Sequence, residues 1–134
     1  MVKCIKCEPH KKAEVVEIDT SVEGLQEAVG GWFEFVYPAR LCDINERLLL
    51  MCNEEGKLEG LEPSRILRDD DKPYDVIAGT CYIMYSTANY QEFEDMPLKV
   101  MLQVMDDDDW KEPVDTEDPV IKLLNQPRFN IEVF

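Results

Sequence analysis

The chain has 134 residues, of which 45% are hydrophobic and 32% are charged. This length and balance indicate one globular domain and exclude a disordered chain. The 29 acidic residues outnumber the 14 basic residues and give a net charge of −15. Such a charge argues against direct binding to nucleic acid or to an anionic membrane, because proteins bind both of these mainly through Lys and Arg side chains. It is compatible with simple solubility, with a basic protein partner, or with imitation of the charge of DNA.

The N-terminal segment and the cysteines predict a protein of the cytoplasm. The first twelve residues lack the apolar core of ~7–15 residues that marks a secretory signal. No apolar run approaches the ~20 residues that span a bilayer. Five cysteines, an odd number, indicate reduced thiols rather than a disulfide framework.

Cys4, Cys7 and His10 have a spacing that resembles part of a zinc site. Residues 2–7 also have the composition of a strand, in which positions three apart point to opposite faces. We therefore expect neither a metal nor a cofactor here, and the sequence leaves the role of Cys4, Cys7 and His10 open. Cys42, Cys52 and Cys81 lie in or beside apolar runs and are expected to be small buried hydrophobic residues.

The N-terminal half predicts short strands around one helix. Thr20 and Glu23 have the spacing of a capping box, and Gly30 provides a C-terminal stop. The predicted elements are strands at 2–7 and 13–18, a helix at 21–29, strands at 32–37 and 48–52, a hairpin turn at 53–56 that returns through 57–61, a crossing segment at 63–67 and a charged turn at 68–73. The apolar run 75–86 is the predicted central strand, with a bulge or close backbone approach at Gly79.

An amphipathic pattern predicts a second helix over 97–105. Leu98, Met101, Leu102 and Met105 recur at helical spacing and are expected to face the core. Four aspartates at 106–109 oppose the helix macrodipole and should end the helix. Residues 119–124 predict one more helical turn started by Thr116, and alternation over 129–133 predicts a last strand.

These elements predict an α+β fold, with a mostly antiparallel sheet of four to six strands and two short amphipathic helices. The expected domain covers 1–105, and 106–134 is expected to be an acidic linker and extension that packs on the domain or on a partner. The predicted core consists of Val15, Ile18, Leu25, Val29, Phe33, Phe35, Leu49, Met51, Leu58, Val76, Ile77, Tyr82, Met84, Leu98, Met101 and Leu102.

Several motifs follow one another in an order that resembles a known family. They are Leu25-Gln26-Glu27 with Val29-Gly30-Gly31, Val36-Tyr37-Pro38, the segment Cys52 to Leu58, Leu61 with Pro63, and Tyr74-Asp75 with Ile77 to Thr80. The chain resembles domain of unknown function 3846 over about residues 3–86. The resemblance implies a small accessory protein of phages, conjugative elements or bacterial genomes, and it implies no catalytic residues. The tail from about 106 onward departs from the family pattern.

The acidic C-terminal region is the candidate functional site. Eleven acids lie within 92–118, against Lys99 and Lys111. The run is not an EF-hand calcium loop, because Lys111 stands where that loop requires Gly. Trp110 lies inside the run and is either an interface anchor or part of the core. The predicted partner-binding residues are Glu92, Glu94, Asp95, Asp106, Asp107, Asp108, Asp109, Trp110, Glu112, Asp115, Glu117 and Asp118.

The sequence favours a non-enzymatic binding protein, because no nucleophile, base or phosphate-loop motif is present. The first hypothesis is an anti-defence protein of a phage or mobile element. It would inhibit a CRISPR or restriction nuclease in the bacterial cytoplasm by occupying the basic surface that binds nucleic acid. The alternatives are sequestration of a nucleotide signal through Arg40, Arg47, Arg65 or Arg68, and an accessory domain of another role.

Overall fold

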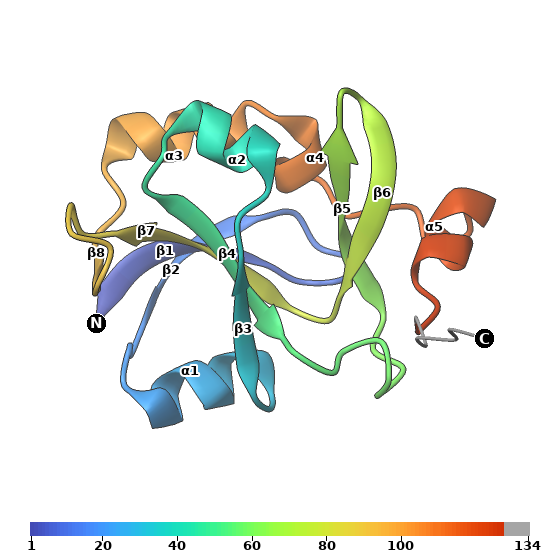
Figure 1. The fold of residues 1–134 in the computed structure, drawn as a ribbon, viewed down its shortest axis with the longest axis horizontal. Coiled ribbons are helices and arrows are strands. Elements are labelled where there is room, and N and C mark those ends of the chain that lie inside the picture. Colours follow the sequence, from blue (N-terminus) through green and yellow to red (C-terminus); the bar gives the residue numbers. More distant parts are fainter. Residues whose placement is uncertain (128–134) are drawn as a thin grey trace, which may run out of the picture.

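The computed structural model describes residues 1–127 and shows an α+β fold (Figure 1). The strands are β1 Val2–Cys7, β2 Glu14–Ile18, β3 Phe33–Val36, β4 Leu48–Asn53, β5 Pro63–Asp69, β6 Lys72–Ala78, β7 Cys81–Ser86 and β8 Phe93–Glu94. The helices are α1 Val22–Val29, α2 Ala39–Ile44, α3 Leu98–Met105, α4 Asp108–Lys111 and α5 Pro119–Leu124. None of the helices described is long and apolar enough to cross a membrane. The strand predicted over 129–133 lies outside the described residues.

The larger sheet has the order β2-β1-β7-β4-β3, and β8 pairs with the end of β7. All of its neighbouring strands are antiparallel. The predicted α+β class and antiparallel sheet are therefore confirmed. β7 lies in the centre, as predicted, and is buried along its whole length because both faces of the sheet are covered.

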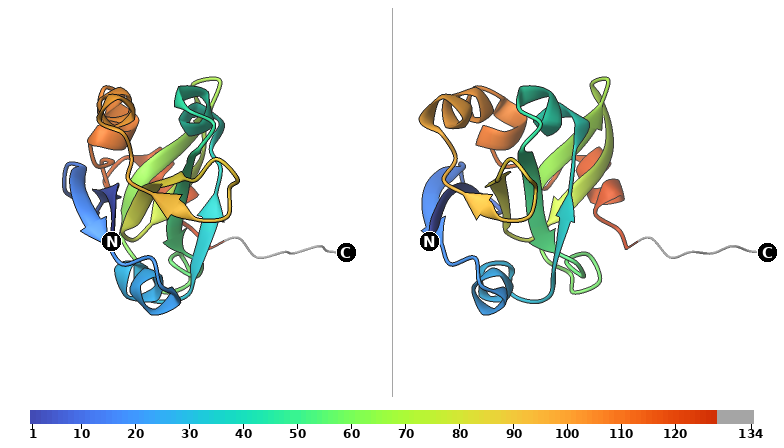
Figure 2. Two further views of the ribbon diagram at one scale, coloured as in Figure 1. Left: turned by 90° about the vertical axis from the view of Figure 1, so that its left-hand side faces the viewer. Right: turned by 60° about the vertical axis from the view of Figure 1, so that its left-hand side comes forward.

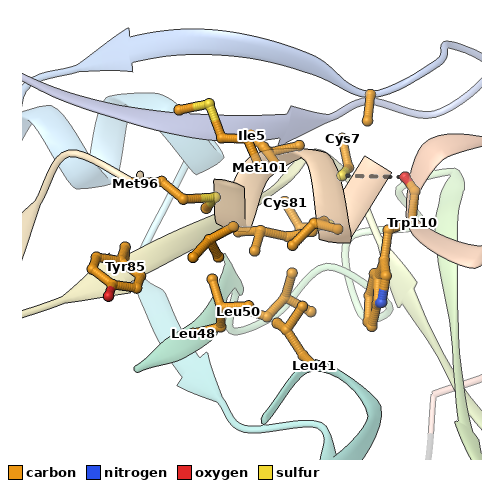
Figure 3. Packing of buried hydrophobic residues seen from close by; sticks show 14 of the residues in the cluster. Ile5, Cys7, Leu41, Leu48, Leu50, Cys81, Tyr85, Met96, Met101 and Trp110 are labelled. Atoms are coloured by element: carbon orange, nitrogen blue, oxygen red, sulfur yellow. Dashed lines mark hydrogen bonds between the residues drawn. The ribbon is translucent and has the colours of Figure 1, made fainter. Parts of the chain in front are cut away.

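The two faces of this sheet carry separate cores because side chains alternate along each strand. Cys81, Ile83 and Tyr85 of β7 belong to the main core, beneath α2, α3 and α4 (Figure 3). Tyr82 and Met84 belong to the second core, which α1 covers from the opposite side (Figure 1).

β5 and β6 form a second, two-stranded sheet, and this region corrects three predictions. The predicted crossing segment 63–67 is part of β5, and the predicted return over 57–61 is a series of turns. The predicted strand 75–86 is two strands, because the chain turns at Gly79, with φ +90°, and passes from the two-stranded sheet into the larger sheet. The charged turn is confirmed, and Asp70 and Asp71 form its tip with φ 49° and 63°.

The helices also differ from the pattern in particular residues. Ser21, rather than Thr20, caps α1 and accepts a hydrogen bond from the Gly24 amide at 3.0 Å. Gly30 ends α1 in the left-handed conformation, as predicted. α2 was not predicted. α5 is confirmed, although its N-cap is Asp118 rather than Thr116.

The buried stripe of α3 differs in part from the predicted one, because Met101 is buried and Met105 is partly buried against the main core, as expected, but the two leucines are not. Val100, Met101 and Val104 are buried, whereas Leu98 and Leu102 are 70% and 62% exposed. The predicted stripe and the buried stripe both have helical spacing. The position of the neighbouring elements determines which of the two is buried. Two further residues of the predicted core are exposed: Val15 lies on the edge strand β2, and Leu58 lies in the turns that follow β4.

Candidate functional site

The segment 106–127 packs against the rest of the molecule. Trp110 is 1% exposed and lies in the main core, so the core interpretation of this residue holds (Figure 3). Ile121 of α5 packs on Ile66 and Val76 of the β5–β6 hairpin. The Ala13 amide donates to the Lys111 carbonyl at 2.8 Å, which joins the N-terminal turn to α4.

The four aspartates 106–109 separate into two kinds. Asp107 and Asp109 turn inward to arginines, whereas Asp106 and Asp108 are exposed. Arg40 of α2 donates through Nη2 to Asp107 Oδ2 at 2.9 Å and through Nη1 to Asp109 Oδ2 at 2.8 Å. Arg68 of β5 donates through Nε to the same Asp109 oxygen at 2.9 Å. This cluster joins α2, α4 and β5.

The local sequence explains why the aspartates alternate in this way. α3 ends at Met105, as predicted, and Asp106 is its C-cap residue. Asp107 then caps α4 by accepting a hydrogen bond from the Asp109 amide at 3.0 Å. Acidic side chains at the start of α4 complement the positive end of its dipole.

Most of the other predicted acids have internal partners. Glu94 pairs with Arg47, Glu112 with Lys12 at 3.5 Å and Glu117 with Lys122 at 3.0 Å. The carboxylates of Asp95, Asp115 and Asp118 accept backbone hydrogen bonds from Lys3, Glu117 and Val120. Within residues 1–127, Glu92, Asp106 and Asp108 are the predicted acids whose side chains have no ion pair or hydrogen bond.

An apolar strip on α3 lies between exposed carboxylates. Leu98 and Leu102 are one turn apart and point outward, and Asp106 continues the same stripe. Asp95 precedes the helix, and Asp108 begins α4. We call Asp95, Leu98, Leu102, Asp106 and Asp108 the α3 surface. Sequence patterning missed it because an amphipathic repeat assigns its leucines to the core.

Arg65 of β5 is a buried charge that the sequence did not indicate. It is 0% exposed and donates to four carbonyl oxygens: Trp110 at 2.7 Å, Ser64 at 2.8 Å, Lys11 at 2.9 Å and Glu8 at 3.2 Å. These bonds fix the β1–β2 turn and α4 to β5. The side chain is enclosed by the fold and is therefore structural.

Cys7 and Cys81 face each other across β1 and β7, next to Arg65. A hydrogen bond from Cys81 and the nearby guanidinium lower the pKa of the Cys7 thiol, whereas the same pairing and burial raise the pKa of Cys81. Cys4 belongs to the second core and Cys7 to the main core, so strand geometry separates the pair as expected. His10 is exposed and bonds Glu62 at 2.6 Å.

The four arginines considered for phosphate recognition all have partners inside the fold. Arg40 and Arg68 bind aspartates, and Arg65 binds carbonyls. Arg47 donates to the Ser86 carbonyl at 2.8 Å, pairs with Glu94 and lies 4.4 Å from the centre of the Tyr85 ring. A phosphate would have to displace these contacts.

The family model described as domain of unknown function (DUF3846) matches residues 2–108. The chain belongs to this family. The DUF3846 match runs from β1 through α3 to the first residue of α4, so Asp109, Trp110 and α5 lie beyond it. Comparisons with curated proteins and with solved structures found no match.

Proposed function

We propose that this DUF3846 protein is a non-enzymatic binding protein, and that its α3 surface docks on a basic surface of another protein. The observation that carries the proposal is the outward-facing pair Leu98 and Leu102, with exposed carboxylates before and after it. An apolar centre with a charged rim is the usual composition of a protein interface.

Each part of the α3 surface has a distinct physical role in the proposed complex. Burying an exposed leucine contributes about 1.5–3 kcal/mol when the burial is complete. The carboxylates of Asp106 and Asp108 orient the complex and exclude acidic partners. The net charge of −15 accelerates the encounter with a basic protein, and this effect weakens as salt is added.

The narrower form of the proposal is inhibition of a host defence nuclease, of the CRISPR or restriction class, in the bacterial cytoplasm. Its support is the acidic charge together with the resemblance to accessory proteins of mobile elements. Asp107 and Asp109 are held by Arg40 and Arg68, so the run 106–109 does not present four consecutive charges. The proposed contact therefore combines apolar burial with a few carboxylates. We do not favour nucleotide sequestration, because Arg40, Arg47, Arg65 and Arg68 are already bound.

The test uses the intact chain against purified nucleases of both classes, with plasmid cleavage as the readout. Two double variants alter the α3 surface: Asp106→Asn with Asp108→Asn, and Leu98→Gln with Leu102→Gln. The matched control is Glu23→Gln with Glu27→Gln, which removes two exposed charges from α1 on the opposite side of the sheet (Figure 1).

The proposal predicts that at least one nuclease is inhibited. Both α3 double variants should then be at least about tenfold weaker, a loss of about 1.4 kcal/mol, and the control should stay within about twofold. Inhibition that the α3 variants leave intact, or that the α1 control weakens equally, would contradict the proposed surface. Cleavage unaffected in every case would contradict the nuclease assignment.

A further inference from the structure

A small pocket lies on the second face of the sheet, where α1 does not cover it. Its volume is about 230 Å³, and it is lined mainly by β3, the start of β4 and the loop between β7 and β8. Figure 2 shows this loop, in dark yellow, reaching toward β3, in cyan. The volume is below the roughly 300–1,000 Å³ of small-molecule sites, and it suits a single side chain.

Aromatic rings form much of the pocket lining. Phe35 packs edge-on against Phe93, with ring centroids 5.5 Å apart. Tyr37 and Tyr90 also line the pocket, and they are 65% and 59% exposed. Tyr90 has a φ of 59°, a left-handed backbone conformation that is strained for a bulky residue.

The charges around the pocket favour a cation. Glu46 and Glu92 line it, are exposed and have no ion pair within residues 1–127. The positive charge in the lining, Arg47, is already paired with Glu94 and stacked on Tyr85. A guest therefore meets aromatic rings, whose faces attract cations, together with two uncompensated carboxylates.

We propose that this pocket receives a cationic side chain, a guanidinium or an ammonium group, from the protein partner. That this cationic side chain belongs to a protein partner rests on the proposed function. The loop that closes the pocket leads through β8 and Asp95 directly into α3, so the pocket continues the same acidic segment that carries the α3 surface. The pocket supplies an anchor point for one basic residue, while the leucines of α3 supply apolar contact.

The inference is tested without the partner, by NMR titration of the intact chain at low ionic strength. The probe is N-acetyl-arginine amide. The matched controls are N-acetyl-citrulline amide, which has nearly the same shape without the charge, and N-acetyl-norleucine amide. The arginine probe should shift the amide signals of Tyr37, Tyr90 and Phe93. The chain should bind the arginine probe about 2-fold to 30-fold more tightly than the citrulline probe, because cation–π contacts contribute binding energy in that range.

Two variants show whether the rings hold the probe. Tyr90→Gly removes one ring and relieves the positive φ, so the fold is retained while arginine binding weakens at least threefold. Trp32→Ala removes a ring that is 66% exposed and does not line the pocket, so binding should not change. Equal binding of arginine and citrulline, shifts elsewhere on the chain, or full binding by Tyr90→Gly would each overturn the inference. Because the probe is not a nuclease, arginine binding without nuclease inhibition would contradict the nuclease assignment and leave the cation pocket standing.

Discussion

Replacing Arg65 by Lys tests whether a buried guanidinium fastens the two sheets and α4 together. Arg65 is fully buried and donates to four carbonyl oxygens from three parts of the chain. Lys keeps the charge but has a single nitrogen on a different geometry, so it cannot reproduce the planar fork. The variant therefore retains a buried charge with fewer partners.

The expected loss follows from the number of bonds. A hydrogen bond to a charged group contributes about 1.5–3 kcal/mol, and the three donors of Lys lie on one nitrogen, so at least one of the four carbonyl oxygens loses its partner. We expect Arg65→Lys to reduce the free energy of unfolding by about 3–5 kcal/mol, the usual cost of leaving a buried charge partly unpaired. A domain has about 5–15 kcal/mol in total, so the variant is close to the limit of folding.

Arg68→Lys is the matched control, because it makes the same change three residues later on the same strand. Its side chain is 30% exposed, so the expected loss is about 1 kcal/mol or less. Urea unfolding of the two variants and the parent chain measures both losses in the free energy of unfolding. The dependence of that free energy on urea concentration is compared among the three proteins. Arg65→Lys within about 1 kcal/mol of the parent, or a loss as large in Arg68→Lys, would refute the reasoning.

Three further predictions concern single residues, and urea midpoints measure each of them. Asp109→Asn should cost about 1–2 kcal/mol through its arginine partners, whereas Asp108→Asn should stay within about 0.5 kcal/mol; equal effects would contradict the pairing. Gly56→Ala should cost more than about 2 kcal/mol, because a Cβ there would lie 2.4 Å from the Ala78 carbonyl oxygen. Burial raises the pKa of Cys4 to about 12, so the unfolded thiol ionises first and stability falls above about pH 9; the decline, up to about 1.4 kcal/mol per pH unit, should be shallower in Cys4→Ala.

The sequence predicted the elements that local chemistry specifies. The end of α1 follows from Gly30, which adopts the left-handed conformation that a helix stop uses. β7 lies in the apolar run 75–86 that was predicted as the central strand, although the same run also holds the end of β6. Its side chains are buried on both faces of the sheet, which agrees with a run of apolar residues without polar alternation. The end of α3 follows from acids that oppose its dipole.

The missed elements depend on distant partners. α2 has six residues and no side-chain cap, so no local signal marks it, and its Leu41 is stabilised by the main core. β5 contains Ser64 and Arg65, two buried polar residues. They lower the hydropathy of the segment, so the sequence did not identify it as a buried strand. Which side chains of α3 are buried depends on the side of the helix that packs on the sheet. Helical spacing alone does not identify that side.

The candidate site was chosen from its charge, but which acids pair inside the fold could not be predicted. Asp109 is held by Arg40 and Arg68, which lie 69 and 41 residues away in the sequence. Such ion pairs form only when the fold brings the residues together. The sequence alone therefore does not distinguish the exposed Asp108 from the paired Asp109. The same reason explains why Leu98, assigned to the core by periodicity, belongs to the proposed docking surface instead.

The most direct test of the central claim is hydrogen–deuterium exchange of the intact chain, with and without a nuclease that it inhibits. The proposed α3 surface predicts slower exchange across residues 92–108 in the complex, and unchanged exchange in α1 on the other side of the sheet. Slower exchange confined to α1 or to the β5–β6 hairpin, with 92–108 unchanged, would contradict it.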